Sequence, residues 1–340
     1  MQRFLLFIFI LSSAIANVWA QPSRWQLESK LQKGVSAGVD LILKQEYSKA
    51  DSLFSELCRE FPAHPAGFLY RVAVLQARSI DFSVPVEREV FDSLLVLGRT
   101  AAVKMKSPWK EYYLGTADGY DAYERADRGA WIAAVRYGSS SASKLEEVIE
   151  QDSSFYDAYV GVGTYYYWRS RKTEFLHWIP FIHDSRAEGI RLLGIAAGRA
   201  GENRFAAISA LISIELDAEN YEQVEYWSRR ALQHYPDTRV FLWGLATAYD
   251  RSKRYHEAIP AYRTLLENLV LAHEPHPYDE IVCRLNLSKS QLSVADTAGV
   301  REQLQKILSY DSVQFSEALQ KRAEAKFQDT WQLLNSLGKN

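Results

Sequence analysis

A repetition with a period of 34 residues, in the second half of the chain, is the feature that most constrains its fold. Tyr221 is followed 34 residues later by Tyr255, and Val224 by Ala258 at the same distance. Pro236 closes the first copy. A fixed period between 20 and 50 residues is typical of proteins built from stacked helical units. The sequence therefore predicts an all-α solenoid of antiparallel helix pairs.

Three clear copies, at 31–64, 205–238 and 239–272, share small and aromatic residues at fixed positions, and the first two also share a proline. In the first copy these are Gly38 and Ala50, Phe54 and Pro62. Small side chains let two helices approach closely, and proline ends the second helix. The pattern resembles the tetratricopeptide repeat (TPR). This resemblance implies a right-handed solenoid, here of about seven helix pairs, that binds its partners through surface residues.

The remaining repeats are less regular. The segments 108–155 and 156–204 each exceed one period, and the second contains an insertion at Arg171–Asp184 with Trp178 and Phe181 as an expected apolar surface. The segment from Tyr112 to Ala197 carries the motifs YLG, WIPF and EGIRLL. It resembles a TPR subgroup that includes exported bacterial members and eukaryotic inclusion-body-clearance proteins. We expect a helix at about 314–337 to cap the last repeat, because terminal repeats need a polar outer face.

The first 20 residues have the pattern of an export signal. Arg3 precedes an apolar run from Phe4 to Leu11, and Val18-Trp19-Ala20 offers a cleavage site. That run is too short to remain in a bilayer, and no later run of 18 apolar residues follows. We expect residues 21–340 to form the exported domain, periplasmic or secreted, without an integral membrane span. Association with an envelope complex would be compatible with this location.

Composition argues against several functions. A net charge of −2 provides no electrostatic field that favours nucleic acid.

The sequence has no phosphate-binding loop, nucleophile elbow or helical zinc motif, so we expect no enzymatic activity, cofactor or metal. The segment His273–Glu280 gathers metal-ligand residue types, but its prolines favour a solvated turn. Cys58 and Cys283 are too few for a disulfide framework, and we expect both to remain unpaired.

The candidate site is the concave groove that the first helices of the repeats would line. Tetratricopeptide domains that hold chaperone C-termini use Lys and Asn in this groove, and the corresponding positions here include Val35, Val39 and Trp243. The groove is instead aromatic in its middle, which suits a protein or peptide partner with apolar side chains. A carbohydrate or small-ligand binder with a platform of Trp109, Tyr120, Tyr167 and Trp168 is the alternative. These rings could also pack between repeats. The predicted groove residues are Trp109, Tyr112, Tyr120, Val160, Thr164, Tyr167, Trp168, Trp243, Asp250 and Arg251.

Overall fold

The computed structural model describes residues 29–176, 183–310 and 315–337. The export signal at 1–20 and the insertion residues Trp178 and Phe181 lie outside these ranges. All regular elements within the described ranges are helices, and no strand occurs among them. Their bounds are α1 Ser29–Leu43, α2 Tyr47–Glu60, α3 Ala66–Asp81, α4 Arg88–Ala102, α5 Trp109–Asp127, α6 Trp131–Gln151, α7 Ala158–Lys172, η1 Glu174–Leu176, α8 Arg186–Arg199, α9 Arg204–Asp217, α10 Tyr221–Leu232, α11 Arg239–Arg251, α12 Tyr255–Val270, α13 Pro277–Ser293, α14 Thr297–Leu308 and α15 Glu317–Leu337.

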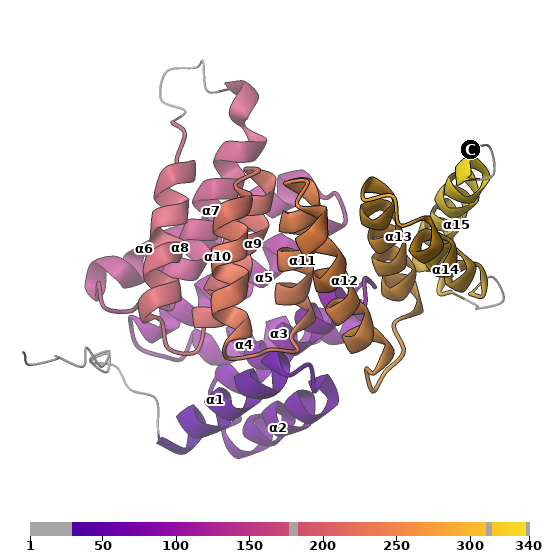
Figure 1. The fold of residues 1–340 in the computed structure, drawn as a ribbon. Coiled ribbons are helices and arrows are strands. Elements are labelled where there is room, and N and C mark those ends of the chain that lie inside the picture. Colours follow the sequence, from indigo (N-terminus) through magenta and orange to yellow (C-terminus); the bar gives the residue numbers. More distant parts are fainter. Residues whose placement is uncertain (1–28, 177–182, 311–314, 338–340) are drawn as a thin grey trace, which may run out of the picture.

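The predicted all-α stack of helix pairs is confirmed. Each helix packs mainly against its neighbours in sequence, so that α1 to α14 form seven consecutive pairs in the described residues. The pairs follow one another along a curve (Figure 1). The pair α5–α6 is the longest, with 19 and 21 residues, and occupies the first of the two segments that exceed one period.

Close contact between the helices of a pair depends on glycine, as the first repeat shows. A Cβ atom on Gly38 of α1 would lie 2.2 Å from the Phe54 ring of α2, so only glycine leaves room for that ring. The same ring stacks on Tyr70 of α3, with 5.2 Å between ring centroids. Phe54 therefore joins the two helices of its own repeat to the next repeat.

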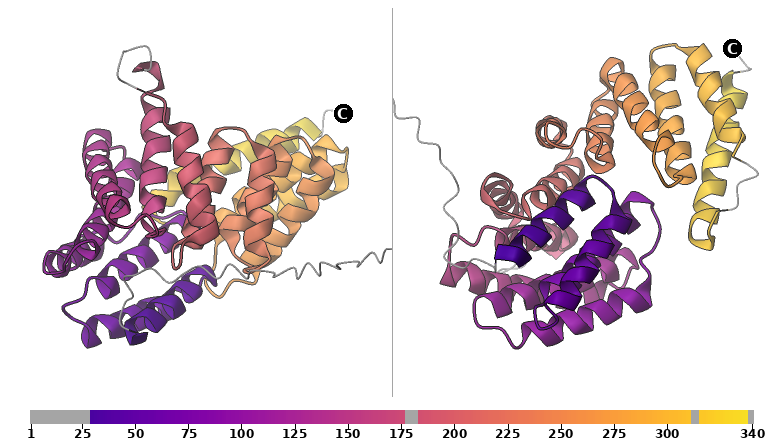
Figure 2. Two further views of the ribbon diagram at one scale, coloured as in Figure 1. Left: turned by 90° about the vertical axis from the view of Figure 1, so that its left-hand side faces the viewer. Right: turned by 90° about the horizontal axis from the view of Figure 1, so that it is seen from below.

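The curve of helices brings the first repeat against repeats that follow it by almost 200 residues. Seen from below, α1 and its neighbours lie on the inner side of the arc (Figure 2). The Thr238 hydroxyl donates to the Leu43 carbonyl over 2.5 Å, and the Gln45 amide donates to the Asp237 carbonyl over 2.8 Å. Arg239 donates to both carboxylate oxygens of Asp81. The concave face is thus partly closed by the chain itself.

The C-terminal helix α15 makes two kinds of contact. Phe327, Leu333 and Leu334 pack against the cluster of α13 and α14 that contains Ile281 and Leu304, which is the position expected of a cap. In addition, Leu319 and Ala323 pack beside Tyr278 and Val84. The Arg322 guanidinium donates to the Ser83 carbonyl over 2.8 Å. α15 therefore also connects the end of the stack to the loop after α3.

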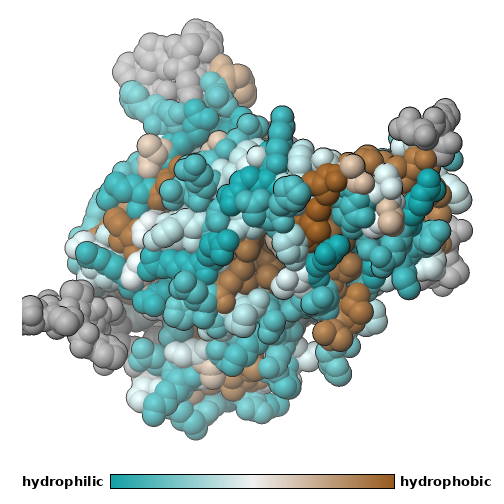
Figure 3. All heavy atoms as spheres, in the orientation of Figure 1, coloured by the Kyte–Doolittle hydropathy of each residue, from teal (hydrophilic) through white to brown (hydrophobic). Residues whose placement is uncertain are grey.

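The outer surface is mostly hydrophilic on the face drawn in Figure 3, with hydrophobic residues exposed over α11 and α12 and in the loop that follows α12. Leu271 in that loop is 83% exposed. Among the described residues, no helix combines the length and the apolar character needed to cross a membrane.

Candidate functional site

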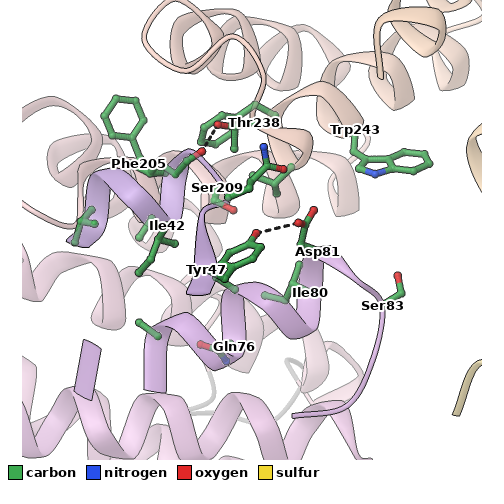
Figure 4. Close-up of a pocket in the computed structure, with 18 of the residues that line it drawn as sticks. Ile42, Tyr47, Gln76, Ile80, Asp81, Ser83, Phe205, Ser209, Thr238 and Trp243 are labelled. Atoms are coloured by element: carbon green, nitrogen blue, oxygen red, sulfur yellow. Dashed lines mark hydrogen bonds between the residues drawn. The ribbon is translucent and has the colours of Figure 1, made fainter. Parts of the chain in front are cut away.

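A cavity lies on the concave face, between the first repeat and the later repeats. It has a volume of about 580 Å³. Figure 4 shows Ile42, Tyr47 and Ile80 from the first helices lying opposite Phe205, Ser209 and Trp243 from α9 and α11. A cavity of this size is typical of small-molecule and side-chain binding sites. The central cavity is lined by Val39, Ile42, Leu43, Gln45, Tyr47, Tyr70, Ala73, Gln76, Ala77, Ile80, Asp81, Ser83, Tyr120, Glu202, Asn203, Phe205, Ala206, Ser209, Thr238, Val240, Phe241, Trp243, Tyr278, Asp279, Val282 and Arg322.

Helix register explains which residues reach the central cavity. Ala206 and Ser209 occupy positions two and five of the repeat that begins at 205, and Val240 and Trp243 occupy the same positions of the next repeat. Ile42 and Leu43, at positions twelve and thirteen of the first repeat, face them from the opposite side. Groove positions of three repeats therefore line the cavity, two and five in two of them and twelve and thirteen in the first, which is a signal present in the sequence.

A buried ion pair forms part of the wall. Arg239 and Asp81 have side chains that are only 7% and 9% exposed, and the Arg239 Nε–Asp81 Oδ1 distance is 2.8 Å. The Tyr47 hydroxyl donates to Asp81 Oδ2 over 3.0 Å (Figure 4). Burial and the charge of Asp81 raise the pKa of Tyr47 above its ordinary value. This hydroxyl therefore stays protonated and serves as a hydrogen-bond donor.

A second carboxylate, Glu202, lies between α8 and α9. Glu202 accepts a hydrogen bond of 2.6 Å from the Ser36 hydroxyl of α1. Burial raises the pKa of Glu202, and the neighbouring Asp157 charge raises it further. Burial also raises the pKa of Asp157, although the backbone amides of Asn203 and Gly201 donate to its carboxylate over 2.8 and 3.3 Å. This part of the wall holds the carboxyl group of Glu202, with the Asp157 carboxyl group behind it outside the lining.

Only two of the predicted groove residues line the central cavity, namely Tyr120 and Trp243. Burial raises the pKa of the Tyr120 hydroxyl to about 12. Tyr112 is buried, and its hydroxyl accepts a hydrogen bond of 2.9 Å from the Asn203 side chain. Trp109 stacks on Tyr113 and contacts Phe155, so its ring fills space between helices. The aromatic middle of the predicted groove is thus largely packed inside the stack.

The predicted groove residues on α7 also lie outside the cavity. Tyr167 is 2% exposed, and its hydroxyl donates to Asp217 of α9 over 2.7 Å. The prediction that the Tyr167 ring lies on the open surface of the groove is therefore wrong. Trp168 packs edge-on against Tyr167 and is half-buried, as are Val160 and Thr164. Of the four rings of the predicted sugar platform, Tyr120 alone lines the central cavity, and Tyr167 is buried.

The last two predicted groove residues lie farther along the stack. Asp250 accepts a hydrogen bond of 2.7 Å from the Ser290 hydroxyl of α13. The Asp250 carboxylate therefore takes part in a contact between two repeats. Arg251 is exposed at the end of α11. Neither residue lines the central cavity.

The His273–Glu280 segment forms contacts between repeats. Glu274 pairs with Arg78 at 3.0 Å, and Asp279 accepts a hydrogen bond from Ser83. His276 is 2% exposed and stacks on Phe82, with 3.9 Å between ring centroids. The described residues contain no group of three or more side chains that could hold a metal ion. This segment is therefore a packed junction and not the solvated turn that its prolines suggested.

The two cysteines are free. Cys283 is buried, and its thiol lies 3.4 Å from the Tyr262 carbonyl. Cys58 is half-buried beside Gly67, where a Cβ atom would come within 2.8 Å of the sulfur. Burial raises the pKa of both thiols, so both are poor nucleophiles.

Comparisons with known proteins identify a structural likeness only. The sequence matches no family model, and a search of curated proteins finds no relative. Among solved structures, the chain is similar to the C-terminal part of a TPR repeat-containing protein from Cytophaga hutchinsonii. The sequence identity is 14% and the TM-score 0.42, over 86% of this chain and 98% of that chain. The all-α stack of helix pairs is therefore established by the helices and packing contacts of this chain and not by the likeness.

Proposed function

We propose that the chain is a non-enzymatic, exported scaffold that binds a protein partner, most simply in the periplasm. Stacked helix pairs commonly use their concave face as a binding surface. The observation that supports this function here is the central cavity, whose walls are mainly apolar and aromatic. Such a cavity suits the apolar side chains of a short partner segment better than a flat sugar ring, because only Tyr120 of the four sugar-platform rings lines it.

Access to the central cavity is provided by partly exposed residues. Ile80 is 49% exposed while lining the cavity, and Ala206 is exposed as well. Figure 4 places Ile80 and Trp243 on opposite walls. A partner segment can therefore enter between α3 and α11 without unfolding a helix pair. Binding energy at such sites is concentrated in a few buried aromatic and apolar contacts.

A pair of matched substitutions tests the proposal. Ala206→Trp places a large ring in the cavity from an exposed position on α9, whereas Ala187→Trp adds the same ring to an exposed position on α8 away from the cavity. In a pull-down from native extract, we expect a partner that the wild type and Ala187→Trp capture and that Ala206→Trp loses. Capture of the same proteins by all three forms would exclude the cavity as the partner site.

A further inference from the structure

Glu202 is a carboxylate without a cationic partner in a cavity with aromatic walls. Its only hydrogen-bond partner among the described residues is the Ser36 hydroxyl, and no Lys or Arg side chain of those residues pairs with it. Tyr70, Tyr120 and Phe205 line the same cavity. Taking a charge out of water without a partner is unfavourable. Glu202 thus places a partly buried carboxyl group in the cavity wall with no cationic side chain of the described residues paired to it.

The groups that face Glu202 from other elements do not supply the missing positive charge. They are Asp157 before α7, Tyr70 on α3 and Tyr235 after α10, and each is acidic or neutral. Tyr235 contacts Asp40 through its hydroxyl over 3.2 Å. The charge of Arg204 acts on Asp157 and partly offsets the rise in its pKa, but Arg204 is not among the groups that shift the pKa of Glu202. Glu202 is thus left without a matching positive charge among the described residues.

The other charged groups of the cavity already have partners. Asp81 is paired with Arg239. Asp279 accepts the Ser83 hydroxyl and lies 3.7 Å from a His276 ring nitrogen. The Arg322 guanidinium donates to the Ser83 carbonyl, and its central carbon lies 4.6 Å from the Tyr278 ring centroid. Glu202 is thus the cavity carboxylate that lacks both a cationic partner and a neighbouring imidazole.

We propose that the central cavity binds an organic ammonium group, with Glu202 as its counter-charge and the rings of Tyr70, Tyr120 and Phe205 around it. Aromatic rings attract a cation to their faces, and cages of rings are a known means of ammonium recognition. The apolar remainder of the ligand lies against Val39 and Ile42. The inference depends on the proposed function, because it names the chemistry of the partner at the same site. The ammonium group belongs to a lysine side chain of the partner segment or to a free amine.

Binding of small probes to the purified chain tests this chemistry by isothermal titration calorimetry. The probes are n-hexylammonium, n-hexyltrimethylammonium, 1-hexanol and hexanoate. We expect the two cations to bind about tenfold more tightly than hexanol, and hexanoate to bind most weakly. Glu202→Gln keeps the hydrogen bond with Ser36 and should remove the tenfold preference. Glu222→Gln, at an exposed position on α10, should retain it.

A second variant and a comparison of two peptides complete the test of the ammonium site. Tyr120→Leu leaves Glu202 in place and should reduce the preference for the trimethylammonium probe by several-fold, since it removes a ring. An acetylated Leu-Leu-Lys-Leu-Leu peptide that binds better than its norleucine analogue would assign the site to a lysine of a protein. A preference seen only with the free probes would assign it to a small amine.

Specific outcomes overturn the inference. Equal affinity of the wild type for hexylammonium and hexanol, or an unchanged preference in a folded Glu202→Gln protein, excludes the ammonium site. If neutral apolar peptides still bind and Ala206→Trp blocks them, the proposed scaffold function stands and only the ammonium chemistry fails. If no probe or peptide binds, both proposals fail.

Discussion

The contact between α7 and α8 can be tested by adding a single methyl group. A Cβ atom on Gly163 would lie 2.7 Å from the Gly189 carbonyl oxygen and 2.9 Å from Leu193 Cγ. The converse atom on Gly189 would lie 2.6 Å from the Gly163 carbonyl oxygen. Because the nearest obstacle in each direction is a backbone carbonyl oxygen, no side-chain rotation can relieve the contact and the helices must separate. Overpacking of this kind costs about 1–3 kcal/mol, so Gly163→Ala should lower the free energy of unfolding by that amount, and Gly163→Leu by more.

Gly194 on α8 provides the matched control. It is helical, like Gly163, but a Cβ atom there would meet nothing within 4 Å. Alanine is favoured over glycine in a helix by about 0.5–1 kcal/mol, so Gly194→Ala should stabilise the protein. The same chemical change thus has opposite signs at two positions of one helix pair.

Urea unfolding followed by circular dichroism measures both effects as shifts of the midpoint at constant slope. We expect the midpoint of Gly163→Ala to fall and that of Gly194→Ala to rise. A Gly163→Ala protein as stable as the wild type would refute the backbone contact between the two helices. A loss of stability in Gly194→Ala equal to that in Gly163→Ala would show that the measured effect does not come from this contact.

Three further predictions address the closure of the stack, its cap and its titration. Arg239→Met should destabilise the protein by about 3–5 kcal/mol in thermal or urea unfolding, because it leaves the Asp81 carboxylate buried without its partner. The double variant Arg239→Met/Asp81→Asn should recover part of this loss, because it also removes the buried charge. Deletion of residues 314–340 should cause aggregation in size-exclusion chromatography, because it uncovers the cluster with Ile281 and Leu304; a monodisperse truncated protein would contradict the capping role of α15. The pKa of Glu202 is raised in the folded chain. Between the ordinary glutamate pKa and the raised one, the folded state therefore binds more protons than the unfolded state. The free energy of unfolding should fall as pH rises through that window. Glu202→Gln should flatten this part of the stability profile relative to Glu222→Gln.

The sequence predicts the local packing of the stack well, because that packing depends on residues close together in the chain. Gly38 and Phe54 belong to one repeat, and their contact follows from the spacing of a small and an aromatic residue. Gly163 and Gly189 likewise occupy small-residue positions of one expanded repeat. α1 and α2 are joined by a short connection, whereas α7 and α8 are separated by the Arg171–Asp184 insertion and still pair their glycines, so the repeat positions set the register of both pairs.

Tyr167 shows where this reasoning fails. It occupies a groove position in the repeat that begins at Tyr156, but that repeat carries an insertion and its first helix continues to Lys172. Asp217 at the end of α9 accepts the Tyr167 hydroxyl and fixes the ring inside the stack. A groove position therefore does not predict an exposed side chain where a neighbouring helix supplies a hydrogen-bond acceptor that holds the ring inside the stack.

The central cavity results from long-range contacts that no local pattern encodes. Thr238 meets the carbonyl of Leu43, and Arg239 meets Asp81, across separations of 195 and 158 residues. These contacts depend on the accumulated curvature of the intervening repeats, so a small change of angle at each pair would open the groove. Once the curvature is known, the lining residues follow from the repeat: Ala206, Ser209, Val240 and Trp243 occupy positions two and five of their copies. The periodic sequence thus determines which side of each helix can bind a ligand, and the curvature determines which repeats act together.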